Sequence, residues 1–410
     1  MQSVVLTKEQ KILLFLTAKS IAKDPLSLVL DERDLEGVDW KVVVDMATKQ
    51  AVPLATFDAV APYVKTIPQE IFIKWQKIAM SVLHSGFFVV QSQAELVKIL
   101  TEKFYPYIIL KGLAANAYYP NKGIRALGDV DFLINPAQQA EIEGVLIEKG
   151  YEKSHGDHPN HVVFKKSRAH LEMHFEVAGV PYGAKGDLVR EFLKSAVFEP
   201  KACTQDGFDF FVPTPENHAL ILLLHMQHHM LGEGLGLRHL CDWATFVNAT
   251  YDEPFWQEKV IPFLKKIGLY RYASVMTKTC TNYLKSACPD WAKEVDDDVC
   301  AEVVEDVLAC GNFGQNDPER SKGGMLVSEH GKDGTKHGRL YHLFKILHDE
   351  TIGTKLVKAC VIFYPFAYIY KIFWHLWRTV TGKSKPLKVY SEAEKRKKVY
   401  DKLKVFDGDC

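Results

Sequence analysis

The spacing of apolar positions separates two helical regions from a middle segment with strand-like runs. Apolar residues recur at helical spacing through residues 1–104 until Pro106 stops the pattern, so we predict a helical N-terminal unit there. A second helical pattern begins at Pro215 and predicts a helical domain over residues 215–310. Between the two, residues 105–214 alternate short apolar runs with turns, which is typical of a sheet.

The middle segment carries the pattern of a small α/β core. Four apolar runs are expected to form strands, namely YIIL, GDVDFLI, HVVFKK and HLEMHFEV. KGLAANAYY and AQQAEIEGVLIEKG lie between the first three runs and are expected to be helices, the second ending at Gly150. This order predicts a mixed sheet. The predicted fold class is α+β, with a small mixed β-sheet core flanked by N-terminal and C-terminal helical units.

Two further segments complete the chain. Residues 311–340 are rich in Gly, Asp, Lys and Ser, and we expect a flexible loop. Residues 341–410 hold an aromatic helical segment followed by a charged tail, which is expected to be a solvated helix.

The aromatic segment raises the question of a membrane. Its uncharged run of twelve residues is shorter than the roughly 20 residues that a helix needs to cross a bilayer, and Pro365 interrupts it. A core or partner-binding helix is the simplest expectation. A helix lying on a bilayer surface is the alternative, so residues 359–378 are expected to make either a protein contact or a peripheral membrane contact. The residues that favour the alternative are Trp374, Trp377, Lys371 and Arg378.

Composition narrows the class of protein. The chain of 410 residues is 47% hydrophobic and 25% charged, which excludes a disordered protein. Its 51 basic and 51 acidic residues balance, so long nucleic acid is a less favoured partner than a small molecule or a protein. Eight cysteines show no Cys-x-x-Cys pair and no disulfide framework, and the N-terminus has no secretory pattern. We expect a cytoplasmic protein.

The candidate chemistry centres on carboxylates. Successive side chains of a strand point to opposite faces, so Asp129 and Asp131 share one face. Two close carboxylates repel unless a cation lies between them, and Mg²⁺ (or Mn²⁺) prefers such oxygen ligands. A pair of these ions can stabilise the attacking and leaving oxygens of a phosphoryl displacement. Glu172, on a later strand, is the expected third carboxylate.

Residues beside the aspartates are suited to phosphate. Lys111 and Gly112 join a strand to a helix, where backbone N–H groups can approach an anion. Arg125 can form bidentate hydrogen bonds to a phosphate. Its other expected role is a salt bridge that holds the aspartates in place.

These residues also carry a resemblance. KGLAANAYYPNKGIRALGDVDFLI, followed by HLEMH, resembles the uncharacterised bacterial nucleotidyltransferase family of the DNA polymerase β-like superfamily. EGLGLRHLCDWATF and CGNFG are similar to further motifs of that family, so the likeness extends roughly from Ile108 to Gly314. Leu113 stands where the superfamily has Gly or Ser, and 17 positions separate Gly112 from Asp129.

The resemblance implies a reaction. A nucleotidyltransferase core over residues 105–214 would transfer a nucleoside monophosphate from an NTP to a hydroxyl of an unidentified acceptor (a small molecule, sugar or protein) and release pyrophosphate. Asp129 and Asp131 would hold two Mg²⁺ ions, and Glu172 would complete one metal site and deprotonate the hydroxyl. Lys111, Gly112 and Arg125 would bind the triphosphate. Arg238 either pairs with Asp242 one helical turn away or faces the nucleotide or acceptor.

Two alternatives from other classes remain. In the first, the chain is a non-catalytic interaction protein with a nucleotidyltransferase fold that binds a partner or a membrane surface through its aromatic segment. In the second, it is a zinc hydrolase that uses His225 and His229, which lie one helical turn apart beside His228. The glutamate of the His-Glu-x-x-His motif is absent from this stretch, so ordinary core or surface histidines are the simpler expectation.

Overall fold

The computed structural model describes residues 5–154, 160–316, 344, 347–348, 351–352, 357, 360–381 and 386–406. Its first hundred residues are helical, as the pattern predicts. Thr7 caps the first helix through a capping box with Gln10, and Pro53 begins a new helix instead of kinking an old one. The elements are α1 (Lys8–Ile21), α2 (Glu32–Leu35), α3 (Trp40–Lys49), α4 (Pro53–Ala59), η1 (Ala61–Thr66) and α5 (Gln69–Glu102).

The sheet is mixed, as predicted. Its strand order is β1-β2-β5-β4-β3, with β2 and β5 parallel and the other neighbours antiparallel. The strands are β1 (Tyr107–Ile109), β2 (Val130–Ile134), β3 (Glu152–Lys153), β4 (His161–Lys166) and β5 (Ala169–His174). Between them lie α6 (Leu113–Asn116), η2 (Lys122–Ile124), η3 (Pro136–Gln138) and α7 (Gln139–Glu148).

A second, two-stranded sheet is absent from the sequence prediction. It is the hairpin of β6 (Lys201–Gln205) and β7 (Phe208–Val212). Asp206 and Gly207 form its turn, both with positive φ (53° and 86°), which is the geometry of a type I′ turn. The hairpin follows α8 (Ala184–Leu193) and η4 (Lys194–Val197).

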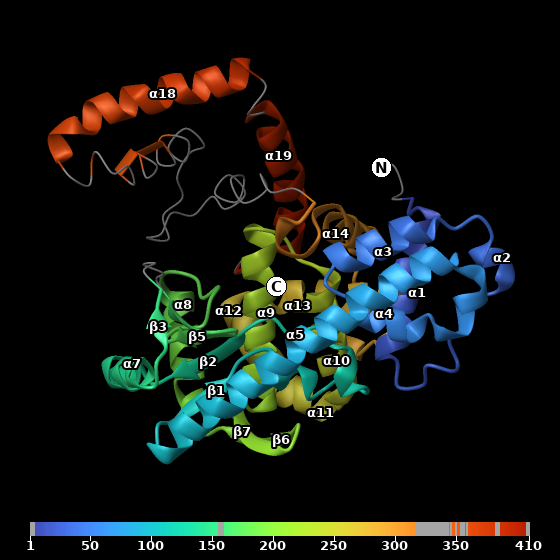
Figure 1. Ribbon diagram of the computed structural model, residues 1–410, viewed down its shortest axis with the longest axis horizontal. Helices are drawn as coiled ribbons and strands as arrows, with labels where there is room; N and C mark the ends of the chain where they lie inside the picture. Colours follow the sequence, from blue (N-terminus) through green and yellow to red (C-terminus); the bar gives the residue numbers. More distant parts are fainter. Residues whose placement is uncertain are drawn as a thin grey trace.

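Helices form the rest of the body. Figure 1 shows α5 crossing the molecule from the N-terminal helices to the sheet, and α9 passing through the centre. One large apolar cluster joins α1, α9, α10, α13 and α14. The elements are α9 (Pro215–Leu231), α10 (Leu237–Ala249), α11 (Glu253–Phe255), the π-helical turn η5 (Trp256–Val260), α12 (Ile261–Ile267), α13 (Tyr270–Leu284), η6 (Asp290–Ala292), α14 (Asp297–Cys310) and η7 (Asn312–Gly314).

Two helices lie near the C-terminus, after η8 (Val361–Phe363): α18 (Tyr364–Val380) and α19 (Pro386–Leu403). The last of these packs on α13 and α14, and Arg396 Nη2 donates to the carbonyls of Met230 and Leu231 at the end of α9. By contrast, α18 stands away from the body in Figure 1 and exposes large apolar side chains. Within the described residues, no helix is both long and apolar enough to cross a bilayer.

Most of the predicted flexible loop lies outside the described residues. Residues 311–316 are described and hold the short η7 turn, while 317–340 are not. The predicted domain boundaries at residues 104, 214 and 310 stay predictions.

Candidate active site

Alternation along two parallel strands separates apolar side chains from polar ones. Val130 and Phe132 of β2 are buried in the apolar cluster that α5 and the sheet share, so Asp131 between them points to the opposite face. Asp131 lies in register with Glu172 of the parallel strand β5. The fold therefore brings a predicted aspartate and the predicted glutamate side by side, although 40 residues of chain separate them.

Asp131 is the most buried of the predicted carboxylates, with a 3% exposed side chain. Its Oδ1 accepts a hydrogen bond from Lys111 Nζ at 2.7 Å and contacts His174 Nε2 at 2.9 Å. Burial alone would raise the pKa of Asp131, but the charge of Lys111 and the His174 contact outweigh it and hold this pKa well below its ordinary value. Asp131 is therefore ionised, with a lysine bound to one of its oxygens.

Asp129 is less compensated than Asp131. One oxygen of Asp129, one oxygen of Glu172 and one nitrogen of His170 all lie within 4.8 Å of one another. Burial, followed by repulsion from Asp131, raises the pKa of Asp129 to about 6. A carboxyl group whose ionised form is disfavoured in this way is one that a nearby cation would stabilise.

The loop after β1 carries Lys111 and Gly112, which line the same cavity as these carboxylates. Gly112 has φ 55° and ψ −115°, a conformation that any side chain would strain, so this position requires glycine. The helix that follows, α6, is only four residues long. Because a single turn has a small dipole, any phosphate contact at this loop depends on Lys111 and the exposed backbone more than on the helix.

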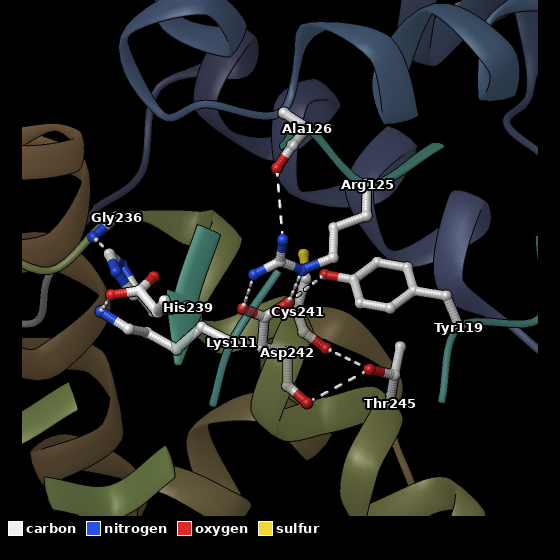
Figure 2. A network of polar contacts seen from close by, with 10 residues as sticks. Lys111, Tyr119, Arg125, Ala126, Gly236, His239, Cys241, Asp242 and Thr245 are labelled. Atoms are coloured by element: carbon white, nitrogen blue, oxygen red, sulfur yellow. Dashed lines mark hydrogen bonds and ion pairs between the residues drawn. The ribbon is translucent and has the colours of Figure 1, made fainter. Parts of the chain in front are cut away.

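Arg125 has a partner that the sequence prediction missed. Its Nε and Nη2 each donate to one carboxylate oxygen of Asp242 at 2.8 Å, and Tyr119 Oη donates to the same carboxylate at 2.7 Å. Figure 2 shows Arg125 and Tyr119 converging on Asp242 of α10. The expected salt bridge of Arg125 with Asp129 and Asp131 is replaced by one with Asp242, which binds the guanidinium fork. Arg125 instead ties the loop before β2 to α10.

The pairing of Arg125 also corrects the expectation for Arg238. The predicted ion pair of Arg238 with Asp242 is replaced by that of Arg125, whose fork takes both oxygens. Among the described residues, Arg238 Nε is buried without a hydrogen-bond partner, and its Cζ lies 5.4 Å from the ring centre of Phe313. Burial and then repulsion from Arg125 lower the pKa of Arg238. The charge of Arg238 is therefore poorly compensated by its neighbours, and its side chain lines a cavity.

All seven positions proposed from the sequence line one cavity of about 370 Å³, within the range of small-ligand sites. They are Lys111, Gly112, Arg125, Asp129, Asp131, Glu172 and Arg238. The same wall carries five carboxylates and three Lys or Arg side chains. An excess of two negative charges matches one divalent cation. Asp129, Asp131 and Glu172 all line the cavity, and their carboxylates offer oxygen ligands of the kind that Mg²⁺ prefers.

Several lining residues were not assigned a role from the sequence. His174 contacts Asp131, and a signal for it existed, because His174 alternates with Glu172 on one face of HLEMH. His239 and Phe313 line the same cavity, together with His225 and His229. Phe313 belongs to the CGNFG segment, but nothing local to that segment indicates that it reaches the cavity.

A comparison with known protein families identifies the family of the chain. The chain matches an uncharacterised nucleotidyltransferase family over residues 36–285, which is more than half of its length. The matched region includes the sheet, α9 and α10, and hence nearly all of the cavity wall. Neither a curated protein nor a solved structure matches the chain.

Proposed function

The chain belongs to the uncharacterised nucleotidyltransferase family, and on that basis we propose that it transfers a nucleoside monophosphate from an NTP to a hydroxyl of an acceptor. Pyrophosphate is the second product. The acceptor is a small molecule, a sugar or a protein, because the balanced charge of the chain disfavours long nucleic acid.

One observation supports this proposal most. Carboxylates from two adjacent strands and a lysine from the neighbouring loop meet in one cavity, and Arg238 lies in the same wall. The cavity thus offers oxygen ligands for a cation together with basic groups for a triphosphate. Each of these alone is common on protein surfaces, but their convergence from four separate segments is not expected without a shared anionic ligand.

Asp129, Asp131 and Glu172 would hold Mg²⁺ or Mn²⁺. Such an ion, when bound, lowers the negative charge on the phosphate oxygens and orients them. The fit rests on the raised pKa of Asp129 and the excess negative charge of the wall.

The chain's own side chains would direct the transfer. An acceptor hydroxyl oxygen forms a bond to the α-phosphorus of the NTP, and the bond from that phosphorus to the bridging oxygen of pyrophosphate breaks. The proton of the hydroxyl passes to Glu172, and the electron pair leaves with pyrophosphate. Lys111 and Arg238 would stabilise the charge on the triphosphate, while Arg125 keeps α10 against the loop that carries Asp129.

The test is transfer of label. Full-length protein is incubated with each NTP labelled at the α-phosphate, Mg²⁺ or Mn²⁺, and cell extract separated into small molecules and proteins. We expect one acceptor class to gain label, and Asp129→Asn or Asp131→Asn to lower the rate by about 100-fold or more. The matched control is Glu176→Gln, since Glu176 pairs with Arg190 at 2.6 Å and is not part of the cavity wall.

The outcome decides between catalysis and binding. Label transfer by wild type and Glu176→Gln, but not by the two aspartate variants, supports the proposal. If no NTP yields labelled product, or if Asp129→Asn/Asp131→Asn keeps both transfer and metal–nucleotide binding, the enzymatic proposal is wrong. Survival of partner binding in the inactive variants would favour the interaction protein.

A separate surface favours a peripheral role for α18. Its residues Phe366, Tyr370 and Phe373 are 69%, 64% and 66% exposed and lie at helical spacing on one face. Between Thr351 and Glu392 the sequence holds lysines and an arginine but no acidic residue. An exposed aromatic face within an acid-free basic segment fits the surface of an anionic bilayer, which we propose as its occupant.

Vesicle binding tests this second proposal. We expect sedimentation with vesicles that contain phosphatidylserine, little with neutral phosphatidylcholine vesicles, and weaker binding at high salt. Phe366→Glu/Phe373→Glu should abolish binding, whereas Phe104→Glu, at a position 91% exposed on the body, should not. Equal sedimentation of all three proteins, or none by wild type, would refute a lipid-binding face and leave a protein contact as the function of α18.

A further inference from the structure

Three histidines from two helices meet in the cavity wall, and the proposed transfer does not use them. His225 and His229 lie one turn apart on α9, and His239 comes from the first turn of α10. The ring centres are 4.3 Å apart for His225 and His229, 5.1 Å for His225 and His239, and 5.2 Å for His229 and His239. One nitrogen from each ring can be chosen so that all three lie within 4.8 Å of one another.

These imidazoles are neutral. Burial lowers the pKa of each of the three rings well below its ordinary value, and neighbouring cationic groups lower it further. A neutral imidazole keeps a lone pair on one nitrogen, which is the form that binds metal ions. Among the described residues, His239 Nε2 is in addition buried without a hydrogen-bond partner, in a side chain that is 2% exposed. A buried polar atom of this kind normally has a partner.

We propose that His225, His229 and His239 together bind a transition-metal ion, with Zn²⁺ as the expected species. Nitrogen ligands select zinc and its neighbours over Mg²⁺, so this site is chemically distinct from the carboxylate cluster in the same cavity. Zinc–nitrogen bonds of about 2.0–2.1 Å in a tetrahedral site place the nitrogens roughly 3.3 Å apart. The three nitrogens, which lie within 4.8 Å of one another, would therefore need to approach by up to about 1.5 Å.

The hydrogen bond from Gly236 to His239 must be accommodated. Gly236 N–H donates to His239 Nδ1 over 3.2 Å, so the proton of the neutral ring is on Nε2. Metal binding through Nε2 moves that proton to Nδ1, releases no net proton and breaks the Gly236 bond. The loss is one neutral hydrogen bond, whereas the gain is a direct bond between a nitrogen and the metal ion. The exchange is strongly favourable.

Three protein ligands leave one position of a tetrahedral ion open. Because all three histidines line the cavity, that position faces the same space as the carboxylates and Arg238. Catalytic zinc sites share this pattern of three protein ligands and one exchangeable water or substrate atom. The ion would thus contact whatever molecule occupies the cavity.

Metal content and spectroscopy test the site without any activity assay. Full-length protein is prepared without a polyhistidine tag, stripped with a chelator, loaded with Zn²⁺ and dialysed. We expect about one zinc ion per chain by mass spectrometry of the metal content, no displacement by millimolar Mg²⁺, and a visible absorption spectrum of tetrahedral type after replacement by Co²⁺. Zinc should also raise the melting temperature of the wild type.

Variants locate the ion. His229→Ala should lower zinc affinity at least tenfold. His228→Ala should not, although His228 directly precedes His229 on α9 and lines the same cavity. His225→Gln is a second ligand variant, for use if His229→Ala does not fold. Asp129→Asn/Asp131→Asn should keep its zinc, which separates this proposal from the transfer reaction. The proposal is wrong if wild type retains no zinc, if His228→Ala loses as much as the ligand variants, or if the aspartate variant alone loses the ion.

Discussion

Asp242 is a single residue that connects two parts of the site. Both of its carboxylate oxygens accept from Arg125, whose guanidinium is buried, and Tyr119 adds a third hydrogen bond. Removing one partner of a buried ion pair leaves an uncompensated charge, which costs about 3–5 kcal/mol. We therefore predict that Asp242→Asn lowers the free energy of unfolding by about that amount, as measured by urea denaturation.

A surface pair provides the control. Asp187 contacts Arg190 with a side chain that is 76% exposed, so Asp187→Asn should change stability by about 0.5 kcal/mol or less. Removing both charges, in Arg125→Met/Asp242→Leu, should cost less than Asp242→Asn alone, because the guanidinium of Arg125 is then not left buried without its partner. Similar losses for Asp242→Asn and Asp187→Asn would contradict the assignment of a buried ion pair.

At the residue scale, the sequence predicts the carboxylates better than their partners. The alternation of polar and apolar positions in GDVDFLI is local, and it predicts that Asp131 points away from Val130, which is buried in the apolar cluster. The pairing of Asp131 with Glu172 comes from the register of two strands that are distant in the sequence. The partner of Arg125 lies 117 residues further along the chain, and no local pattern indicates it. The i, i+4 spacing of Arg238 and Asp242 predicts a pair that a stronger long-range pair displaces.

At the scale of elements, Gln50 holds three helices together. This buried side chain follows α3, donates through Nε2 to Val307 O of α14 at 2.8 Å, and accepts through Oε1 from the N–H of Leu237 at 2.9 Å. Leu237 is the first residue of α10, the helix that carries Arg238 and His239.

Replacing Gln50 by Leu should therefore weaken the junction. The change leaves the buried N–H of Leu237 without its partner, while Val307 O still accepts from Gly311 N–H. We expect a loss of about 1–3 kcal/mol in the free energy of unfolding. Thermal and urea unfolding measure it, with Gln69→Leu, at an exposed position in the first turn of α5, as the control. A variant at Gln50 as stable as the control would show that α10 does not depend on this contact.

The elements themselves were predicted with uneven success. Long periodic segments such as α5 and α9, and the four apolar runs of the sheet, form as expected. The β6–β7 hairpin was missed, although Asp206-Gly207 between apolar runs is a strong hairpin signal. The last predicted strand is shorter than the HLEMHFEV run, since pairing ends at His174. Strand ends depend on the neighbouring strand, which one sequence segment does not contain.

At the scale of the whole molecule, the cavity is a product of chain topology. Its wall combines the loop after β1, two strands, the ends of α9 and α10, and the turn at Phe313. Gly234 and Gly236 allow the turn between α9 and α10 to approach the segment at Cys310 and Asn312, where an added Cβ would lie within 3 Å of side-chain atoms. Such a close approach between distant segments is visible only in the folded chain.

The buried histidines of this helical body predict a pH dependence of its stability. His218 is fully buried, and burial lowers its pKa to about 4, whereas a histidine in the unfolded chain titrates near 6.5. Between these pH values the unfolded state binds more protons than the folded state, so stability increases with pH across that range. Above about pH 6.5 His218 is neutral in both states and does not lower stability. As the pH falls to 4, proton binding to His218 in the unfolded chain lowers the free energy of unfolding by about 3 kcal/mol.

Replacing His218 by Phe should flatten this part of the profile. The ring packs against Tyr118 and Phe246, so an aromatic replacement keeps the packing while removing the titrating group. Urea unfolding at several pH values from 7 to 4 gives the slope, which is compared with that of His84→Phe, where the replaced histidine is exposed. Comparing slopes rather than absolute stabilities removes any packing cost of the larger ring. If both variants lose stability as steeply as the wild type, His218 is not a source of the acid sensitivity, and the proton uptake that opposes folding must arise at other buried groups.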